Sequence, residues 1–103
     1  ASRGDLSTAE THLAAAAKLQ PQSEVVLNNL GLVKAKQGKL EQALKYYQAS
    51  LQINPKFSSA HFNSGLALEQ LGREFDARRH YQETLSLVPN HSQARERLQS
   101  LLK

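Results

Sequence analysis

Two asparagines, Asn29 and Asn63, stand thirty-four residues apart and carry side chains well suited to binding another polypeptide. A carboxamide offers two N–H donors and a carbonyl acceptor, so it can pair with a peptide backbone whatever side chains that peptide carries. If the two asparagines lie on successive copies of one structural element, their amides form a short ladder. Such a ladder favours recognition of a peptide over bond-breaking chemistry.

Four histidines raise the question of a metal site: His12, His61, His80 and His91. A zinc site needs three or four ligands that converge on the ion at about 2 Å. No two of these histidines have the i, i+4 spacing that places both on one helix face. We therefore expect no metal site and no cofactor, and we interpret His61 as a packed residue that makes one hydrogen bond.

The chain has one cluster of basic residues, formed by Arg73, Arg78, Arg79 and His80. Glu74 and Asp76 partly neutralise it, and the net charge of the whole chain is only +4. Nucleic-acid-binding domains usually concentrate more positive charge than this on one face. The pattern favours a solvated helix face and argues against a nucleic-acid partner, while an acidic partner or a phosphate surface stays open as the alternative.

The sequence holds no motif of a known catalytic site. It has no glycine-rich phosphate loop after a strand, no nucleophile elbow and no helical His-Glu-x-x-His. The absence of cysteine excludes disulfides, thiolate metal sites and cysteine nucleophiles, and leaves the cellular compartment open. We predict no catalytic residue and hence no enzyme activity.

The 103 residues have a uniform composition and suffice for one small domain. The mean hydropathy is −0.53, and no apolar run is long enough for a transmembrane helix or a signal-peptide core. We therefore expect no insertion into a membrane. The chain does not begin with methionine, which predicts that it is a fragment or a processed product of a longer chain.

Several classes of residue recur with a period of thirty-four: Pro21, Pro55 and Pro89; Gly38 and Gly72; Ala43 and Ala77; Tyr47 and Tyr81. Such a period is the signature of a repeat architecture. It divides the domain 1–103 into two full units, 21–54 and 55–88. The back half of a unit, 1–20, precedes them, and the front half of another, 89–103, follows.

Each unit predicts two helices joined by a tight turn. Apolar residues follow the helical period, and no stretch alternates as a strand does. Gly38 and Gly72 stand where a first helix ends in a left-handed residue, and Ser23, Ser58 and Ser92 are expected to be N-caps. The expected helices are 5–19, 23–37, 40–53, 58–71, 74–87 and 92–102.

A glycine in the middle of a helix, such as Gly31 or Gly65, costs about 1 kcal/mol relative to alanine. Because both occur at the same phase of the repeat, we expect a packing reason for them. The small residues Ala43 and Ala77 predict that two helix backbones approach closely at glycine opposite alanine.

These residues together resemble the tetratricopeptide repeat, a family of thirty-four-residue helix–turn–helix units. The family's large, leucine, small, alanine, aromatic and proline positions are filled in the first unit by Leu27, Leu30, Gly31, Ala43, Tyr47 and Pro55. Gly65, Ala77, Tyr81 and Pro89 fill theirs in the second unit. The resemblance covers the whole chain and implies an all-α fold, a right-handed superhelix of about six antiparallel helices.

In this family the first helices of the units line a concave groove that binds peptides. By resemblance, the groove residues here are Asn28, Asn29, Leu32, Lys36, Phe62, Asn63, Leu66, Gln70 and Arg97. The asparagine pair and the segment 60–63 also resemble the asparagine-ladder arms of O-linked glycosyltransferases. Another subgroup clamps a C-terminal carboxylate, but only Asn63 and Arg97 match its five positions.

The chain departs from the family pattern at a few positions. Lys34 replaces an aromatic residue, and we expect its stem to lie along the apolar seam with the ammonium in water. Ser64 replaces a leucine. Glu74 takes an apolar position, so we expect either a local shift or a partly exposed Phe75.

The two ends of the chain differ. The last helix keeps Ala94, Leu98, Leu101 and Leu102 for one face and is otherwise polar, as a capping helix would be. The first helix lacks its partner upstream, so upstream repeats are expected in the parent protein. The apolar residues of this helix are a candidate self-association face, through which the chain can form a homodimer: Leu6, Ala9, Leu13 and Ala16.

The sequence therefore predicts a non-catalytic scaffold that binds a partner peptide or helix in its groove. Two alternatives remain. The chain can be the substrate-recognition arm of a larger enzyme such as a glycosyltransferase, or an assembly repeat that self-associates through its first helix.

Overall fold

A computed structural model describes residues 3–103 of the chain. Within that range the backbone forms helices joined by short turns, with no strand: α1 (Arg3–Leu19), α2 (Glu24–Lys36), α3 (Leu40–Ile53), α4 (Ser58–Gln70), α5 (Glu74–Leu87) and α6 (Ser92–Leu101). These bounds agree with the sequence-based prediction to within two residues at each end. The all-α fold class is confirmed.

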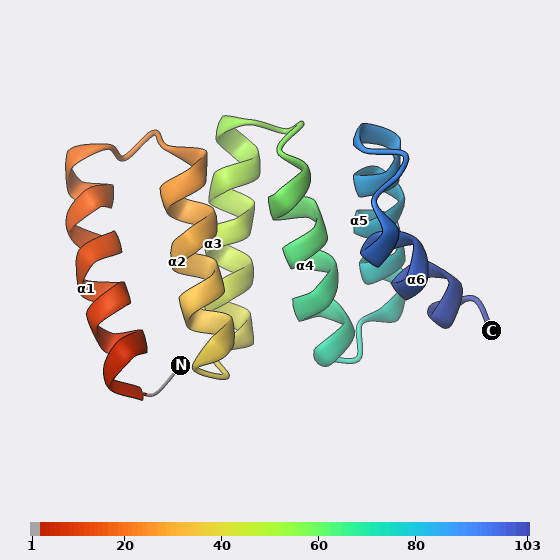
Figure 1. Cartoon of the computed structure of the whole chain (residues 1–103), viewed down its shortest axis with the longest axis horizontal. Coiled ribbons are helices and arrows are strands. Elements are labelled where there is room, and N and C mark those ends of the chain that lie inside the picture. The colour runs from red at the N-terminus through yellow and green to blue at the C-terminus, as the bar shows by residue number, and fades with distance from the viewer. Residues whose placement is uncertain (1–2) are drawn as a thin grey trace.

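The helices follow one another along the longest axis of the molecule, from α1 at one end to α6 at the other (Figure 1). Each helix packs on the next, and α2 also packs on α4. The extents of 41 × 27 × 20 Å describe an elongated stack. No helix in the described range is long and apolar enough to cross a membrane.

The turn within each full unit depends on glycine, as predicted. Gly38 has φ +81° and Gly72 has φ +80°, a left-handed conformation that other residues adopt only with strain. The amide of the following residue then bonds to the helix: Lys39 N donates to Lys34 O, and Arg73 N donates to Leu68 O. This Schellman arrangement ends α2 and α4 and reverses the chain into α3 and α5.

The helix N-termini agree only in part with the prediction. Ser23 is the N-cap of α2, and its hydroxyl accepts a hydrogen bond from Val26 N. The predictions for Ser58 and Ser92 were wrong, because each is the first residue inside its helix. The cap before Ser92 is His91, whose Nδ1 accepts from Ala94 N at 3.0 Å. An imidazole thus satisfies the amide that a serine hydroxyl was expected to satisfy.

The core contains one tyrosine ring from each unit. Tyr47 and Tyr81 are 1% and 0% exposed, and burial raises the pKa of the Tyr47 phenol to about 12. A Cβ at Gly31 would stand 2.4 Å from Tyr47 Cε1, and a Cβ at Gly65 would stand 2.5 Å from Tyr81 Cε1. The glycines therefore make room for tyrosine rings, and the expected contact with alanine was the wrong partner.

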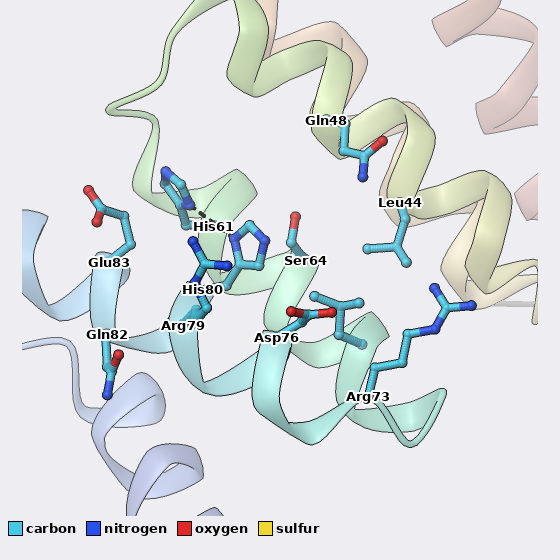
Figure 2. A pocket seen from close by; sticks show the side chains of 11 residues that line it. Leu44, Gln48, His61, Ser64, Arg73, Asp76, Arg79, His80, Gln82 and Glu83 are labelled. Carbon is cyan, nitrogen blue, oxygen red and sulfur yellow. Dashed lines mark hydrogen bonds between the residues drawn. The ribbon is translucent and has the colours of Figure 1, made fainter.

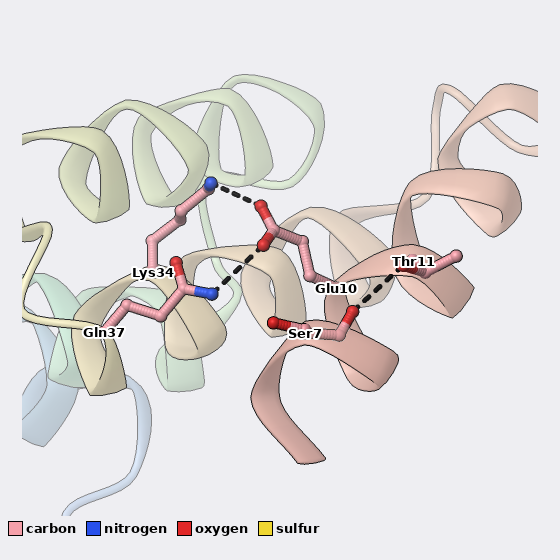
Figure 3. Close-up of polar contacts among 5 residues, drawn as sticks. All are labelled: Ser7, Glu10, Thr11, Lys34 and Gln37. Atoms are coloured by element: carbon pink, nitrogen blue, oxygen red, sulfur yellow. Dashed lines mark hydrogen bonds and ion pairs between the residues drawn. The ribbon is translucent and has the colours of Figure 1, made fainter. Parts of the chain in front are cut away.

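Lys34 has a partner that the sequence did not predict. Its ammonium forms an ion pair with Glu10 of α1, and its side chain is 12% exposed (Figure 3). Gln37 Nε2 donates to the other carboxylate oxygen of Glu10 at 3.0 Å. The hydrogen bonds from Lys34 and Gln37 hold the pKa of the Glu10 carboxyl below its usual value. This polar cluster fastens α1 to α2.

Two further expectations concerned apolar side chains that the structure leaves exposed, Phe75 and Leu102. Because α5 begins in the same register as α3, Phe75 projects outward and is 66% exposed, with Arg78 Cζ 5.9 Å from its ring centre. Leu102 is 62% exposed, so it does not belong to the apolar face of α6, where Ala94 is fully buried. It is the C-cap of α6, and its N–H donates to Leu98 O at 3.1 Å.

Candidate functional site

The first helices of the units, α2, α4 and α6, carry the residues expected to line a groove. Their side chains lie at different depths. Lys36 and Gln70 are exposed, whereas Asn29, Leu32, Phe62, Asn63, Leu66 and Arg97 are half-buried and Asn28 is buried. Contact between α2 and α4, and between Glu69 and Arg97 of α4 and α6, joins the three helices side by side.

Asn28 and Asn63 form a direct contact between two units. Asn63 Nδ2 donates to Asn28 Oδ1 at 3.0 Å, and Asn28 is 5% exposed. The repeat spacing pairs Asn63 with Asn29, and it gave no indication of this bond. Asn28 therefore lies beneath the surface and orients the Asn63 amide, which keeps its carbonyl oxygen and its second N–H.

The apolar residues of this layer belong largely to the core. Leu32, Phe62 and Leu66 pack against the buried cluster around Tyr47 and Tyr81. The ring of Phe62 lies 5.8 Å from that of Tyr81 and 4.7 Å from that of His91, measured between ring centres. Phe62 thus joins α4, α5 and the start of α6, and only part of each apolar side chain remains available to a ligand.

Arg97 is held by its own chain. Its guanidinium makes two hydrogen bonds to the Glu69 carboxylate, and Tyr81 Oη donates to Glu69 Oε1 at 2.8 Å. The bonds from Arg97 and then Tyr81 lower the pKa of the Glu69 carboxyl. Burial, followed by the neighbouring Glu69 carboxylate, raises the pKa of the Tyr81 phenol. This bidentate pair fixes α6 against α4.

Models of the tetratricopeptide repeat match residues 25–57 and 58–91, which together span most of the chain. The chain belongs to the tetratricopeptide repeat family. The two matches follow one another without a gap, as the period of thirty-four predicts. No curated protein matches the sequence significantly.

Solved structures share the fold at low sequence identity. MamA is 20% identical with a TM-score of 0.84, and the match covers 89% of this chain and 54% of that one. The first TPR domain of Spaghetti is 20% identical with a TM-score of 0.92, covering 96% and 79%. The O-GlcNAc transferase of Thermobaculum terrenum is 23% identical with a TM-score of 0.89, covering 96% and 19%. The chain thus spans about half of MamA and a fifth of the transferase.

The second repeat brings together two histidines that the sequence analysis kept apart. His61 Nδ1 and His80 Nδ1 lie 3.1 Å from one another, and His61 Nε2 lies 2.8 Å from Pro55 O. The hydrogen bond expected of His61 is confirmed. Both histidines stand where the first repeat has apolar or aromatic residues, Leu27 and Tyr46, and that joint replacement was the signal available in the sequence.

The geometry of this histidine pair is that of a hydrogen bond. The ring centres are 5.3 Å apart, close to the sum of the nitrogen separation and the two ring radii, so the nitrogens point directly at one another. Two ligands of one metal ion would instead be angled toward a third point. Among residues 3–103, no group of three or more His, Cys, Asp or Glu side chains could hold a metal ion.

The basic cluster is divided between two surroundings. Arg78 lies over Phe75. Arg73, Arg79 and His80 line one cleft between α3 and α5, and Arg73 is paired there with Glu41 through two hydrogen bonds. Asp76 and Glu83 line the same cleft, so its basic side chains are interspersed with acidic ones.

Proposed function

We propose that this chain is a non-catalytic scaffold that binds an extended partner peptide across α2, α4 and α6, with Asn29 and Asn63 pairing with the peptide backbone. The observation that carries this proposal is the bond from Asn63 to Asn28. It orients one carboxamide in advance, so less freedom is lost when a ligand binds. Asn29, the equivalent residue of the preceding repeat, is half-buried and provides the second amide.

The neighbours support a role in protein interaction. Spaghetti's first TPR domain was solved bound to the HSP90 peptide SRMEEVD. This chain has the same backbone fold, at a TM-score of 0.92, and its first helices α2 and α4 likewise pack side by side. Exposed Lys36 and Gln70 at the ends of α2 and α4 add polar contacts at its rim.

The surroundings of Arg97 argue against a clamp for a C-terminal carboxylate. Its guanidinium is already paired with the Glu69 carboxylate. A ligand carboxylate would have to displace an internal anion that is also bonded to Tyr81. We therefore assign Arg97 to positioning α6, and we expect the peptide to be recognised through its backbone amides.

The proposal is tested with a peptide selected from a random phage-displayed library against this chain. Calorimetry then compares Asn29→Ala, Asn63→Ala and the double variant with the parent chain. Loss of a hydrogen bond that leaves a partner unpaired costs about 1–3 kcal/mol, so each single variant should weaken binding roughly five- to 150-fold.

Gln52→Ala is the matched control, since Gln52 is an exposed amide side chain on α3 and not on one of the first helices. It should bind as the parent chain does. Unchanged affinity in the double variant, with the circular dichroism spectrum intact, would show that the amides do not contact the ligand.

A second candidate is favoured by the likeness to the O-GlcNAc transferase of Thermobaculum terrenum. There the matched region is 19% of the chain, at a TM-score of 0.89. In that reading this chain is the substrate-recognition arm of a larger enzyme. The parent coding sequence discriminates: a catalytic domain in the same polypeptide supports the arm, and further repeats alone support the free scaffold.

A homodimer through α1 is the third proposal. Leu6, Ala9, Leu13 and Ala16 are half-buried, since α1 packs on α2, while Leu19 is 84% exposed. Sedimentation over a wide concentration range tests it. A mass that rises with concentration in the parent chain and falls to that of a monomer in Leu13→Gln supports this face. A constant monomer mass excludes it.

A further inference from the structure

A polar cleft lies between α3 and α5, and its lining includes none of the asparagines. Its volume is about 560 Å³, within the range of small-molecule sites. Gln48 and Leu44 of α3 form one wall, His80 and Asp76 of α5 form the other, and Ser64 of α4 lies between them (Figure 2). None of these residues takes part in the proposed peptide groove.

The first repeat contains the same hollow with different chemistry. A cavity of about 350 Å³ is lined there by Leu27, Gln42, Lys45, Tyr46 and Ala49. Each of these residues stands thirty-four positions before a residue that lines the larger cleft: His61, Asp76, Arg79, His80 and Glu83. The lining of the first repeat can therefore be compared, residue by residue, with the lining of the cleft in the second.

Three positions change from apolar or aromatic to polar together. Leu27 becomes His61, and Tyr46 becomes His80. Leu30, which is 3% exposed in the core, becomes Ser64. The new side chains all face one cleft, and the two histidines bond to each other. Concerted substitution at neighbouring positions is expected of a binding site rather than of drift at single positions.

The Ser64 hydroxyl has no partner among the described residues. The residue is 1% exposed and its Oγ is buried, yet it makes no hydrogen bond. Buried polar groups are nearly always hydrogen-bonded, and an orphan one needs an explanation. A leucine would fill the position as it does in the first repeat. Retention of a hydroxyl here indicates a polar group that enters the cleft.

The hydrogen bonds fix which histidine nitrogens donate. Because Pro55 O can only accept, His61 Nε2 carries a proton, and in the neutral ring His61 Nδ1 is an acceptor. His80 Nδ1 must then donate to it, which leaves His80 Nε2 as an acceptor. The neutral pair therefore offers an outward lone pair and no outward N–H.

The charged groups of the cleft have an excess of acceptors. Asp76 and Glu83 line it, and neither forms an ion pair within 4.0 Å in the described structure. The cations of the lining are Arg73, which Glu41 pairs and whose charge also interacts with Asp76, and Arg79. Two carboxylates and the His80 lone pair thus face two guanidinium groups, of which one already has Glu41 as a partner, and this leaves acceptors for a ligand rich in N–H donors.

We propose that the cleft between α3 and α5 binds the guanidinium or ammonium group of an arginine or lysine side chain from a partner protein. The cation contacts Asp76 and His80 Nε2, and the Ser64 hydroxyl accepts one of its N–H groups. This face is separate from the peptide groove, so both can be occupied at once.

The probe is N-acetyl-arginine amide, titrated into ¹⁵N-labelled protein and followed by NMR, with the imidazole nitrogens observed directly. Saturable shifts at His80 and in α5 are expected. N-acetyl-citrulline amide, a neutral molecule of the same shape, should bind about tenfold more weakly, since hydrogen bonds to charged groups are the stronger ones. N-acetyl-glutamate amide should not bind.

Two variants locate the site. Asp76→Gln installs the residue of the first repeat at an exposed position and should weaken arginine binding about tenfold without affecting the fold. The triple variant His61→Leu, Ser64→Leu, His80→Tyr installs the first repeat's side chains and should abolish binding. Asn63→Ala, which lies outside the lining of the cleft, should leave arginine binding unchanged.

The proposal is overturned if arginine and citrulline derivatives bind equally or if the glutamate derivative binds more tightly. It also fails if no saturable shift is seen, or if Asp76→Gln binds as the parent chain does. Since Asp76 is exposed, the last result stands even if the triple variant does not fold.

Discussion

The ring of Tyr47 occupies the space where a side chain on Gly31 would begin: a Cβ there would stand 2.4 Å from Cε1 and 2.6 Å from Cδ1. Tyr81 and Gly65 repeat the relationship one unit later. Each helical hairpin is therefore closed by a tyrosine that needs a glycine opposite, and the glycines are retained in spite of their low helix propensity.

Replacement of Gly31 by alanine should destabilise the fold. In an open helix the change would stabilise by about 1 kcal/mol, but overpacking against a buried ring costs about 1–3 kcal/mol. We expect the cost to prevail, because a ring that is 1% exposed has little room to move. Urea denaturation measures the difference. In a Tyr47→Leu background the same substitution should become neutral or stabilising, and equal destabilisation in both backgrounds would contradict the contact.

Ser23→Ala should cost about 1 kcal/mol, since the hydroxyl of Ser23 caps α2 through Val26 N. Ser92→Ala is the matched control, because Ser92 lies inside α6 and the cap is made by His91. Thermal melts of the two variants compare them directly. A larger loss for Ser92 than for Ser23 would show that the caps are assigned wrongly.

The local features of the fold could be read from the sequence, and the contacts between helices could not. The helix bounds follow from the period of the apolar residues and from helix propensity. The turns at Gly38 and Gly72 follow from the tolerance of glycine for a positive φ. All of these act within a few residues. The partner of Gly31 depends on how far a tyrosine ring reaches across a hairpin. Sequence spacing suggested Ala43, which is closer to Gly31 along the chain, because spacing carries no information on the length and direction of a side chain.

The polar contacts across helices were also beyond the reach of spacing. Glu10 and Lys34 come from different units, and Asn63 meets Asn28 in place of its repeat equivalent Asn29. The histidine pair could have been found by asking which apolar positions of the first repeat turn polar in the second. For locating this histidine pair, a comparison of the two repeats is more informative than the i, i+4 spacing rule.

Glu10→Gln should loosen α1. The neutral amide leaves the Lys34 ammonium, on a side chain that is 12% exposed, without its counter-charge. We expect faster hydrogen exchange throughout α1 and a lower melting temperature, with α4 to α6 unaffected. Glu41→Gln removes an exposed pair with Arg73 and should change little, because exposed ion pairs contribute little. Unaltered exchange in α1 would refute the role of Glu10.

Glu69 should make the fold sensitive to acid. Hydrogen bonds from Arg97 and Tyr81 lower its pKa below the ordinary value of 4.5, so the folded chain binds this proton less readily than the unfolded chain does. Its contribution is complete above pH 4.5 and is lost as the pH falls through the lowered pKa. Urea midpoints between pH 3 and 7 should fall less steeply with acid in Glu69→Gln than in the parent chain. Glu96→Gln, an exposed change on α6, should retain the parent slope.

His80 should add a separate step in the pH profile nearer neutrality. Burial, and then the neighbouring His61 and Arg79, lower the pKa of His80 below 6.5, although Asp76 and Glu83 act in the opposite direction. Between that lowered pKa and 6.5 the unfolded chain binds a proton that the folded chain does not. Stability should therefore be constant above about pH 7.5 and should decline as the pH falls below 6.5.

Urea midpoints measured from pH 8 to pH 5 test this dependence of stability on pH. His80→Tyr, which restores the first repeat's residue, should flatten the profile, whereas His12→Gln on exposed α1 should not. A parent profile that is level down to pH 5 would mean that His80 accepts a proton in the folded chain as easily as in the unfolded one.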